Sequence, residues 1–107
     1  MKRVAVFHLR IETDVREAMA GYEARSRGLG DRFKRAFYAT VEDLLDFPEK
    51  HPVKVDSSIR TRLMRPFPYL VFYVVENATL FVLSVQYAGR SPTHLRDPLG
   101  ERLNSNG

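Results

Sequence analysis

Two apolar segments in the second half of the chain constrain its fold more than any other feature. Residues 69–75 read YLVFYVV and residues 80–87 read LFVLSVQY, with only E-N-A-T between them. Aromatic and β-branched residues are typical of β-strands, and a short polar break between two such runs predicts a hairpin turn. Successive side chains on a strand point to opposite faces. Both faces of this hairpin are therefore apolar, and both need cover.

The alternation predicts which side chains share a face. In 69–75, one face takes Leu70, Phe72 and Val74, and the other takes Tyr69, Val71, Tyr73 and Val75. In 80–87, one face takes Phe81, Leu83, Val85 and Tyr87, and the other takes Leu80, Val82, Ser84 and Gln86.

Two helices are predicted upstream of these strands. Thr13 is expected to cap the first helix and Gly28 to stop it. The second is expected to begin near residue 30 and to end at Phe47, because the residue before Pro48 is pushed away from helical angles. A stripe at helical spacing is expected to be core: Leu29, Phe33, Phe37, Val41, Leu44 and Leu45. The short connector predicts an antiparallel helical hairpin.

The remaining segments complete an α+β arrangement. Residues 3–9 and the alternating residues 59–64 are predicted strands, and 48–58 is predicted to be a polar loop. The predicted order is β-α-α-β-β-β, with the helical hairpin on one face of a small, mainly antiparallel sheet. We expect a single domain over 1–97 and a flexible polar tail over 98–107.

The helical hairpin is expected to cover only one face of the sheet. The other face would then expose aromatic and branched side chains, and an exposed apolar patch usually marks a partner surface. Without a partner, this face would serve as a homodimer contact.

Composition narrows the classes of function. With 17 Lys and Arg against 13 Asp and Glu, the net charge is +4 and the pI about 9.7, which favours nucleic acid or acidic partners. There is no cysteine, so disulfides and thiolate chemistry are excluded.

The histidines lack metal-ligand spacing and there is no phosphate-binding glycine motif, so no metal or cofactor is expected. The longest apolar stretch is too short to span a membrane, and a cytoplasmic location is expected.

Three segments together carry a family resemblance: F-P-E-K-H-P (47–52), R-P-F-P-Y-L-V-F-Y-V-V (65–75) and L-F-V-L-S-V-Q-Y-A-G-R-S-P (80–92). Their ordered combination resembles the RelE/ParE superfamily, the plasmid-stabilisation toxins of bacterial type II toxin–antitoxin systems. The resemblance covers roughly residues 12–97. It implies a small toxin that a separate antitoxin holds inactive by wrapping across its surface.

The resemblance implies two alternative mechanisms. Some members enter the ribosomal A site and cleave mRNA, whereas others bind DNA gyrase and are not nucleases. In the nuclease branch, Arg60 and Arg62 match two lysines, and Tyr87 and Arg90 are the further candidate catalytic residues. Leu70 stands where that branch has an arginine, so a binding mechanism and a non-toxic, eroded member both stay open.

Other residues are candidates for partner or nucleic-acid contacts: Arg65, His94, Arg96, Tyr69 and Tyr73. Each functional interpretation has a structural alternative. The basic row of Arg60, Arg62 and Arg65 is equally typical of a solvated strand face. Tyr87 is more typical of a packed ring whose hydroxyl meets water, and Arg90 is more typical of a structural hydrogen bond.

Overall fold

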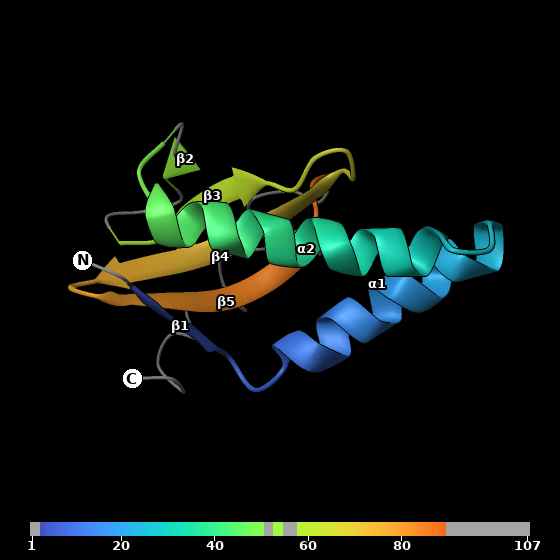
Figure 1. The fold of residues 1–107 in the computed structure, drawn as a ribbon, viewed down its shortest axis with the longest axis horizontal. Coiled ribbons are helices and arrows are strands. Elements are labelled where there is room, and N and C mark those ends of the chain that lie inside the picture. Colours follow the sequence, from blue (N-terminus) through green and yellow to red (C-terminus); the bar gives the residue numbers. More distant parts are fainter. Residues whose placement is uncertain (1–2, 51–52, 55–57, 90–107) are drawn as a thin grey trace.

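The computed structural model describes residues 3–50, 53–54 and 58–89. Its elements follow the order β1 (Val4–Phe7), α1 (Ile11–Arg25), α2 (Leu29–Asp46), β2 (Val53–Lys54), β3 (Arg60–Leu63), β4 (Tyr69–Glu76) and β5 (Thr79–Tyr87) (Figure 1). The predicted α+β order is confirmed, and the two-residue β2 is an addition within the segment predicted as a loop. The predicted boundary between residues 97 and 98 lies outside the described residues.

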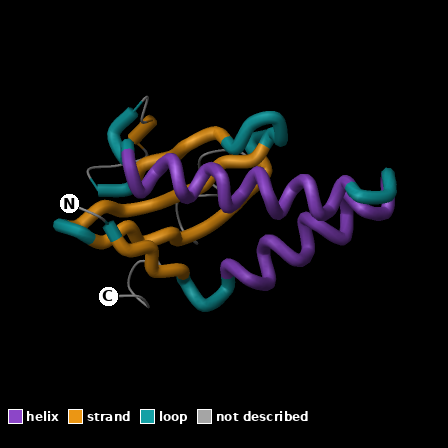
Figure 2. The backbone as a smooth tube through the Cα atoms, viewed as in Figure 1, coloured by secondary structure: helices purple, strands orange, loops and turns teal. Residues whose placement is uncertain are grey.

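The strands form one sheet in the order β1-β5-β4-β3-β2. Neighbouring strands are antiparallel except β1 and β5, which run parallel. The helices form a hairpin over one face, and the turn that joins them projects beyond the sheet (Figure 2). The predicted antiparallel meander of the last three long strands is therefore confirmed.

The helix α1 begins two residues earlier than Thr13, the predicted cap. Arg10 occupies the N-cap position and makes no side-chain capping bond. Instead, the buried residue His8 accepts two hydrogen bonds at the start of the helix. Its carbonyl oxygen accepts one from the amide of Ile11, and its Nδ1 accepts one from the amide of Arg10. The prediction for Thr13 is wrong because the buried side chain of His8, which precedes the helix, accepts the amide hydrogen bond at its start. Local sequence rules do not include such a contact.

Gly28 starts the second helix rather than stopping the first. Helix α1 ends at Arg25, and Gly28 is the N-cap of α2 with φ of 85°, a left-handed conformation that favours glycine. The carboxylate of Glu23 on α1 accepts hydrogen bonds from the amides of Gly28 and Gly30, at 3.0–3.1 Å. A residue of the first helix thus caps the second, which fixes the turn of the hairpin.

Gly30 also sets how closely the two helices approach. A Cβ atom at this position would lie 2.7 Å from the backbone oxygen of Met19 on α1. Backbone atoms cannot move away as a flexible side chain can, so only glycine fits this contact.

The core lies between the helical hairpin and one face of the sheet. The predicted stripe on α2 supplies four buried residues: Phe33, Phe37, Val41 and Leu44. They pack against sheet residues that include Val71, Tyr73, Leu80, Val82 and Val85. Interlocked aromatic rings, among them Phe33 with Tyr69 at 4.9 Å between centroids, fill the middle of this layer.

A β-bulge changes which residues of β5 face the helices. Phe72 pairs with Ser84, whereas the next residue, Tyr73, pairs with Val82, so Leu83 is the extra residue. The strict alternation predicted for this strand holds up to Leu83 and is wrong after it. Val85 consequently belongs to the helix-side core instead of sharing a face with Leu83.

The second face of the sheet is not the exposed patch that the sequence predicted. Phe72, Val74 and Leu83 are buried on that face, and they form a cluster with Ile59 that includes no residue of α1 or α2. Phe72 and Val74 lie on β4, Leu83 lies on β5, and Ile59 lies directly before β3. The exposed apolar residues lie elsewhere, chiefly along and after β1.

Replacing Gly30 by alanine should lower the free energy of unfolding by about 1–3 kcal/mol, because the added methyl group meets the Met19 carbonyl. Gly21→Ala is the matched control, since apart from its chain neighbours and the backbone of its own helix no atom lies within 4 Å of the added methyl group, and alanine favours helix. It should stabilise by up to about 1 kcal/mol. Urea denaturation measures both, and equal changes in the two variants would contradict the close approach at Gly30.

Glu23 should make the hairpin sensitive to acid. The amide groups of Gly28, and then of Gly30, lower the pKa of Glu23 below its ordinary value of 4.5. Because the folded-state pKa is the lower one, the stabilisation is present above about pH 4.5 and is lost as the pH falls through the folded-state pKa. Thermal melts from pH 7 to pH 3 should show a smaller acid-induced decline for Glu23→Gln than for the native chain. Glu42→Gln, at an exposed position of α2, is the control and should decline as the native chain does.

Candidate functional site

The two arginines of β3 point to the helix side of the sheet, at the C-terminal end of α2. Register fixes this orientation, since Arg60 lies opposite Tyr73 and Arg62 opposite Val71, both helix-side core residues. The two side chains therefore share a face, as the alternation predicted. Their surroundings decide whether they can act on a phosphate.

Arg62 is held by acceptors of α2. Its Nη1 donates to Asp43 Oδ2 at 2.6 Å and its Nη2 donates to the carbonyl oxygen of Phe47 at 2.9 Å. The side chain is only 12% exposed. A forked guanidinium that is buried and bound on both arms is a structural tie, because it would have to break both contacts to reach a ligand.

Arg60 is more loosely held. Its Nη2 lies 3.7 Å from Glu49 Oε1, and the arginine side chain is 20% exposed, whereas that of Glu49 is largely exposed. An ion pair of this length to an exposed carboxylate contributes little stability. Arg60 is thus the more available of the two cations.

Tyr73 is a core residue beneath these arginines. Its ring is fully buried and its hydroxyl donates to the carbonyl oxygen of Pro48. Burial raises the pKa of Tyr73, against an opposing effect of Arg62 and Arg60. A partner contact by Tyr73, as predicted from sequence, would require the ring to leave the core.

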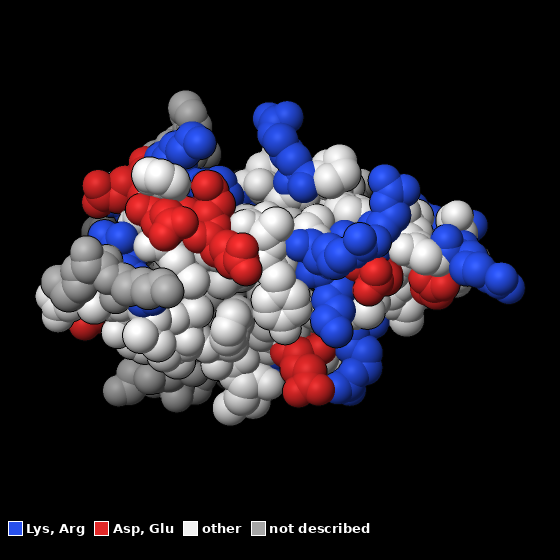
Figure 3. Space-filling view, viewed as in Figure 1, with Lys and Arg blue, Asp and Glu red and all other residues white. Residues whose placement is uncertain are grey.

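Charge along α2 runs against its helix dipole. Arg32, Lys34 and Arg35 lie in its first half, and four acidic residues follow in its second half and just beyond: Glu42, Asp43, Asp46 and Glu49. On the face drawn in Figure 3, an acidic cluster lies over the C-terminal end of α2, although acidic and basic side chains also lie side by side elsewhere on this face. The negative end of the dipole therefore lies among carboxylates.

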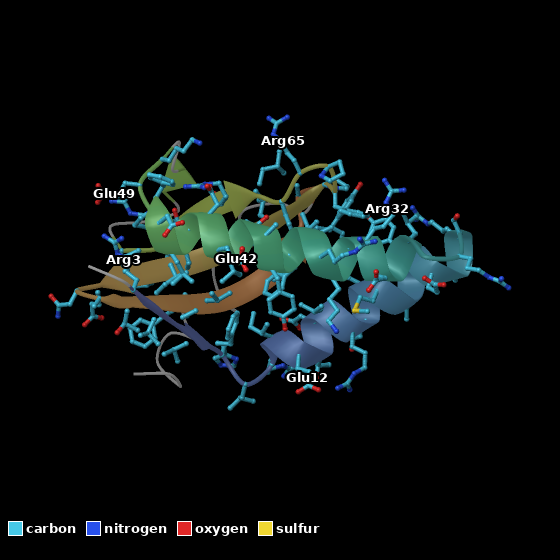
Figure 4. All side chains as sticks on the ribbon, in the orientation of Figure 1. Arg3, Glu12, Arg32, Glu42, Glu49 and Arg65 are labelled. Atoms are coloured by element: carbon cyan, nitrogen blue, oxygen red, sulfur yellow. The ribbon has the colours of Figure 1, made fainter. Side chains whose placement is uncertain are left out.

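Two arginines from outside the helix compensate for this arrangement. Arg62 bonds Phe47, and Arg3 donates from Nη1 to the carbonyl oxygen of Leu45 at 3.1 Å. Arg3 and Glu49 lie beside this end of the helix, while Arg32 and Arg65 point to solvent (Figure 4). The arginines satisfy helix carbonyls that have no partner within the helix.

The candidate catalytic residues do not converge. Tyr87 lies opposite Tyr69, and their ring centroids are 5.9 Å apart. Arg60 lies opposite Tyr73, four residues further along β4, which is about 13 Å along the strand. Arg90, His94 and Arg96 lie outside the described residues. The structure thus joins Arg60 with Arg62, and Tyr87 with Tyr69, as two separate groups.

Sequence reasoning missed a groove beside β1. A cavity of about 570 Å³ opens between the end of β1 and the two helices, and its lining includes Phe7, Leu9, Val15, Tyr38, Arg16 and Lys34. Leu9 is 80% exposed, and Phe7 and Tyr38 are also exposed. The apolar side chains of the segment R-V-A-V-F-H-L are the sequence feature that could have indicated this groove. Only the sheet order, however, shows that β1 is an edge strand.

Within the described ranges, no helix is long and apolar enough to cross a membrane. The same part of the chain holds no group of three or more His, Cys, Asp or Glu residues that could bind a metal ion. A scan against protein-family models found no match, and a search of curated proteins also found none.

Arg62→Ala should lower the free energy of unfolding by about 1.5–3 kcal/mol, because it removes two hydrogen bonds to the end of α2 and leaves Asp43 without its cation. Arg60→Ala is the matched substitution on the same strand face and should cost less than about 1 kcal/mol. Urea denaturation measures both changes. Unchanged stability in Arg62→Ala would argue against the structural role and for a ligand-binding one.

Proposed function

We propose that this chain is the toxin component of a bacterial type II toxin–antitoxin pair of the RelE/ParE kind. In this proposal it inhibits growth by binding the translation or replication machinery, and a cognate antitoxin neutralises it. The observation that carries the proposal is an apolar strand edge that pairs with no other strand of the described residues, beside an apolar groove on a basic domain. The β-α-α-β-β-β order, on which the resemblance partly rests, is present and gives further support.

The open edge of β1 is suited to a protein partner. The amides of Val4 and His8 donate to carbonyl oxygens of the β5 side, at Ala78 and Val82. By alternation, the amides of Ala5 and Phe7 point to the open edge. Val4 is 63% exposed. Natural proteins rarely leave an apolar edge strand uncovered, since it pairs readily with another chain.

The groove indicates an acidic, amphipathic occupant. Its exposed apolar residues, Phe7, Leu9 and Tyr38, would take the apolar side chains of such a segment. Arg16 and Lys34 line the same groove together with Glu12, which pairs with Arg16 at 2.6 Å, so Lys34 and the +4 net charge of the whole chain would attract acidic side chains on the occupant. An antitoxin segment of this composition would cover edge and groove together.

The described contacts favour binding over mRNA cleavage. Phosphate-binding arginines must be free to meet the substrate, but Arg62 is tied to Asp43 and Phe47. Tyr87 lies too far along the sheet to act with Arg60 on one bond. The ribosome-dependent endonuclease remains the alternative, supported by the looser contact of Arg60 with Glu49.

Inducible expression in a bacterial host should slow growth, and co-expression of the small protein encoded next to the gene should restore it. Leu9→Glu should weaken binding of that partner at least about tenfold, because it adds a negative charge to the groove. Ala20→Glu is the control, since it adds the same charge at an exposed position of α1 that does not line the groove. Isothermal titration calorimetry with the purified proteins measures the affinities.

Two further readouts from the same culture distinguish the mechanisms. Reduced plasmid supercoiling with intact messages would support gyrase binding, whereas cut messages in primer extension would replace the binding mechanism by the endonuclease. Normal growth at high expression would refute toxicity, and equal losses of affinity in Leu9→Glu and Ala20→Glu would refute the groove as the partner site. The mass of the isolated chain in solution tests the predicted homodimer.

A further inference from the structure

A second cleft opens between α1 and the end of the sheet where β4 begins and β5 finishes. Its volume is about 280 Å³, and neither the groove beside β1 nor the acidic end of α2 contributes a residue to it. An aromatic lining with few charges favours a ligand whose surface is largely apolar. The lining includes three tyrosines, a proline, a carboxylate and a glycine: Tyr22, Tyr69, Tyr87, Pro68, Glu17 and Gly21.

The three tyrosine rings form a continuous aromatic surface. Tyr69 packs against both of the others, with centroid distances of 6.1 Å to Tyr22 and 5.9 Å to Tyr87. Tyr87 is 49% exposed, and the backbone at Gly89 holds it from another side, where an added Cβ would lie 2.4 Å from Tyr87 Cε2. A half-exposed ring held in this way binds a ligand with little loss of side-chain freedom.

The tyrosine hydroxyls supply hydrogen-bond donors to the cleft. In the part of the chain that the structure describes, the hydroxyls of Tyr22, Tyr69 and Tyr87 form no hydrogen bond with the protein. Burial, and then Tyr69, raise the pKa of Tyr22 above its ordinary value of 10.0 against an opposing effect of Arg25, so this hydroxyl keeps its proton at neutral pH. A ligand that matches such donors offers carbonyl oxygens that are not already bonded.

Helix α1 forms one wall of the cleft, and the middle of this wall is open. Glu17, Gly21 and Arg25 follow at intervals of four residues, so they share one face of the helix. Apart from its chain neighbours and the backbone of its own helix, no atom lies within 4 Å of a Cβ added at Gly21. A ligand can therefore approach the helix closely at this position.

The two charges of this wall differ in their availability. The guanidinium of Arg25 lies 5.7 Å from the ring centroid of Tyr22 and is engaged by that ring. Glu17 is exposed and has no ion pair within the described residues. Glu17 is therefore the charge that remains for a ligand, and it attracts a cation.

A polyproline II helix matches these features. It rises about 3.1 Å per residue, so two residues span about 6 Å, which is the spacing of neighbouring rings in the cleft. It has no internal hydrogen bonds, and its carbonyl oxygens are therefore open to the tyrosine hydroxyls. Domains that recognise proline-rich segments bind them in grooves lined by aromatic side chains. The small volume of the cleft suits one turn of three residues.

We propose that this cleft binds one turn of a proline-rich segment of another protein. Proline rings pack against Tyr69 and Tyr87, carbonyl oxygens accept hydrogen bonds from the tyrosine hydroxyls, and a lysine or arginine beside the prolines pairs with Glu17. A nucleic-acid strand fits less well, because Glu17 repels phosphate and Arg25 is engaged by Tyr22. The inference is independent of the proposed toxicity and of any antitoxin, since it concerns binding by the purified chain.

Four fluorescein-labelled probes test the ligand in fluorescence anisotropy titrations of the purified chain. Two peptides carry six prolines, one preceded by arginine and the other by glutamate. A third peptide carries arginine before six alternating glycines and serines, and the fourth probe is a single-stranded RNA of eight nucleotides. The arginine–proline peptide should bind at least about tenfold more tightly than the glycine–serine peptide and about threefold more tightly than the glutamate–proline peptide.

A variant at Gly21 tests the cleft without removing any contact of the fold. Gly21→Gln fills the open middle of the α1 wall and should weaken binding of the arginine–proline peptide at least about tenfold. Glutamine favours helix more than glycine, so unfolding does not explain such a loss. Ala20→Gln is the control, because it adds the same side chain at an exposed position of α1 outside the cleft, and its affinity should not change.

Variants at the tyrosine and the carboxylate test the two kinds of contact separately. Tyr87→Leu should weaken binding about tenfold, and Tyr87→Phe, which keeps the ring and loses the hydroxyl, about threefold. Glu17→Gln should abolish the preference for arginine over glutamate beside the prolines, whereas Glu42→Gln, on α2, should keep it. Circular dichroism verifies that each variant is folded.

Three results would overturn the proposal. The first is that neither proline peptide binds at protein concentrations up to about 1 mM. The second is that the glycine–serine peptide binds as tightly as the arginine–proline peptide, and the third is that Gly21→Gln and Ala20→Gln lose affinity equally. Binding of the RNA alone, with a loss of affinity in Gly21→Gln, would overturn it as well and assign the cleft to nucleic acid.

Discussion

The C-terminal end of α2 is the point on which the arrangement of this domain depends. Carboxylates gather where the helix dipole is already negative, and Arg62 and Arg3 offset them by bonding the carbonyl oxygens of Phe47 and Leu45. These bonds join α2 to β3 and to the residue before β1, two strands on opposite sides of the sheet centre. The helical hairpin is thereby fixed at one end by these arginine contacts and at the other by the Glu23 cap, with the aromatic core between them.

Much of the fold follows from patterns in single segments. The stripe from Phe33 to Leu44 predicted a buried helix face, and the short break E-N-A-T predicted the hairpin, because both depend on residues close in sequence. The errors arose where distant contacts decide the outcome. His8 takes the role predicted for Thr13 at the helix start, and the bulge at Leu83 exchanges the faces to which the later side chains of β5 point. A pattern of side chains shows neither a tertiary hydrogen bond nor a change in register.

The site was harder to predict than the fold for the same physical reason. Alternation correctly put Arg60 and Arg62 on one face, but it does not reveal that Asp43 and Phe47 bind Arg62. Likewise, Tyr87 was identified as a candidate by its place at a strand end, whereas its neighbours Tyr22 and Arg25 come from α1. Residue type indicates what a side chain can do, and only the tertiary contacts show whether it is free to do it.

The parallel pairing of β1 with β5 has a consequence for how the chain is made. Val4 pairs with Thr79, a separation of 79 − 4 = 75 residues, so the first strand synthesised needs the last strand as its neighbour. Contacts this distant in sequence slow folding, because the entropy cost of closing a long loop comes before any hydrogen bond between the two strands can offset it. During synthesis, the Val4–Phe7 strand has no pairing partner within the chain until nearly the whole domain has left the ribosome. The nascent domain thus carries two unpaired edges on β1, whereas β5 pairs one of them in the folded domain and no other described strand pairs the second.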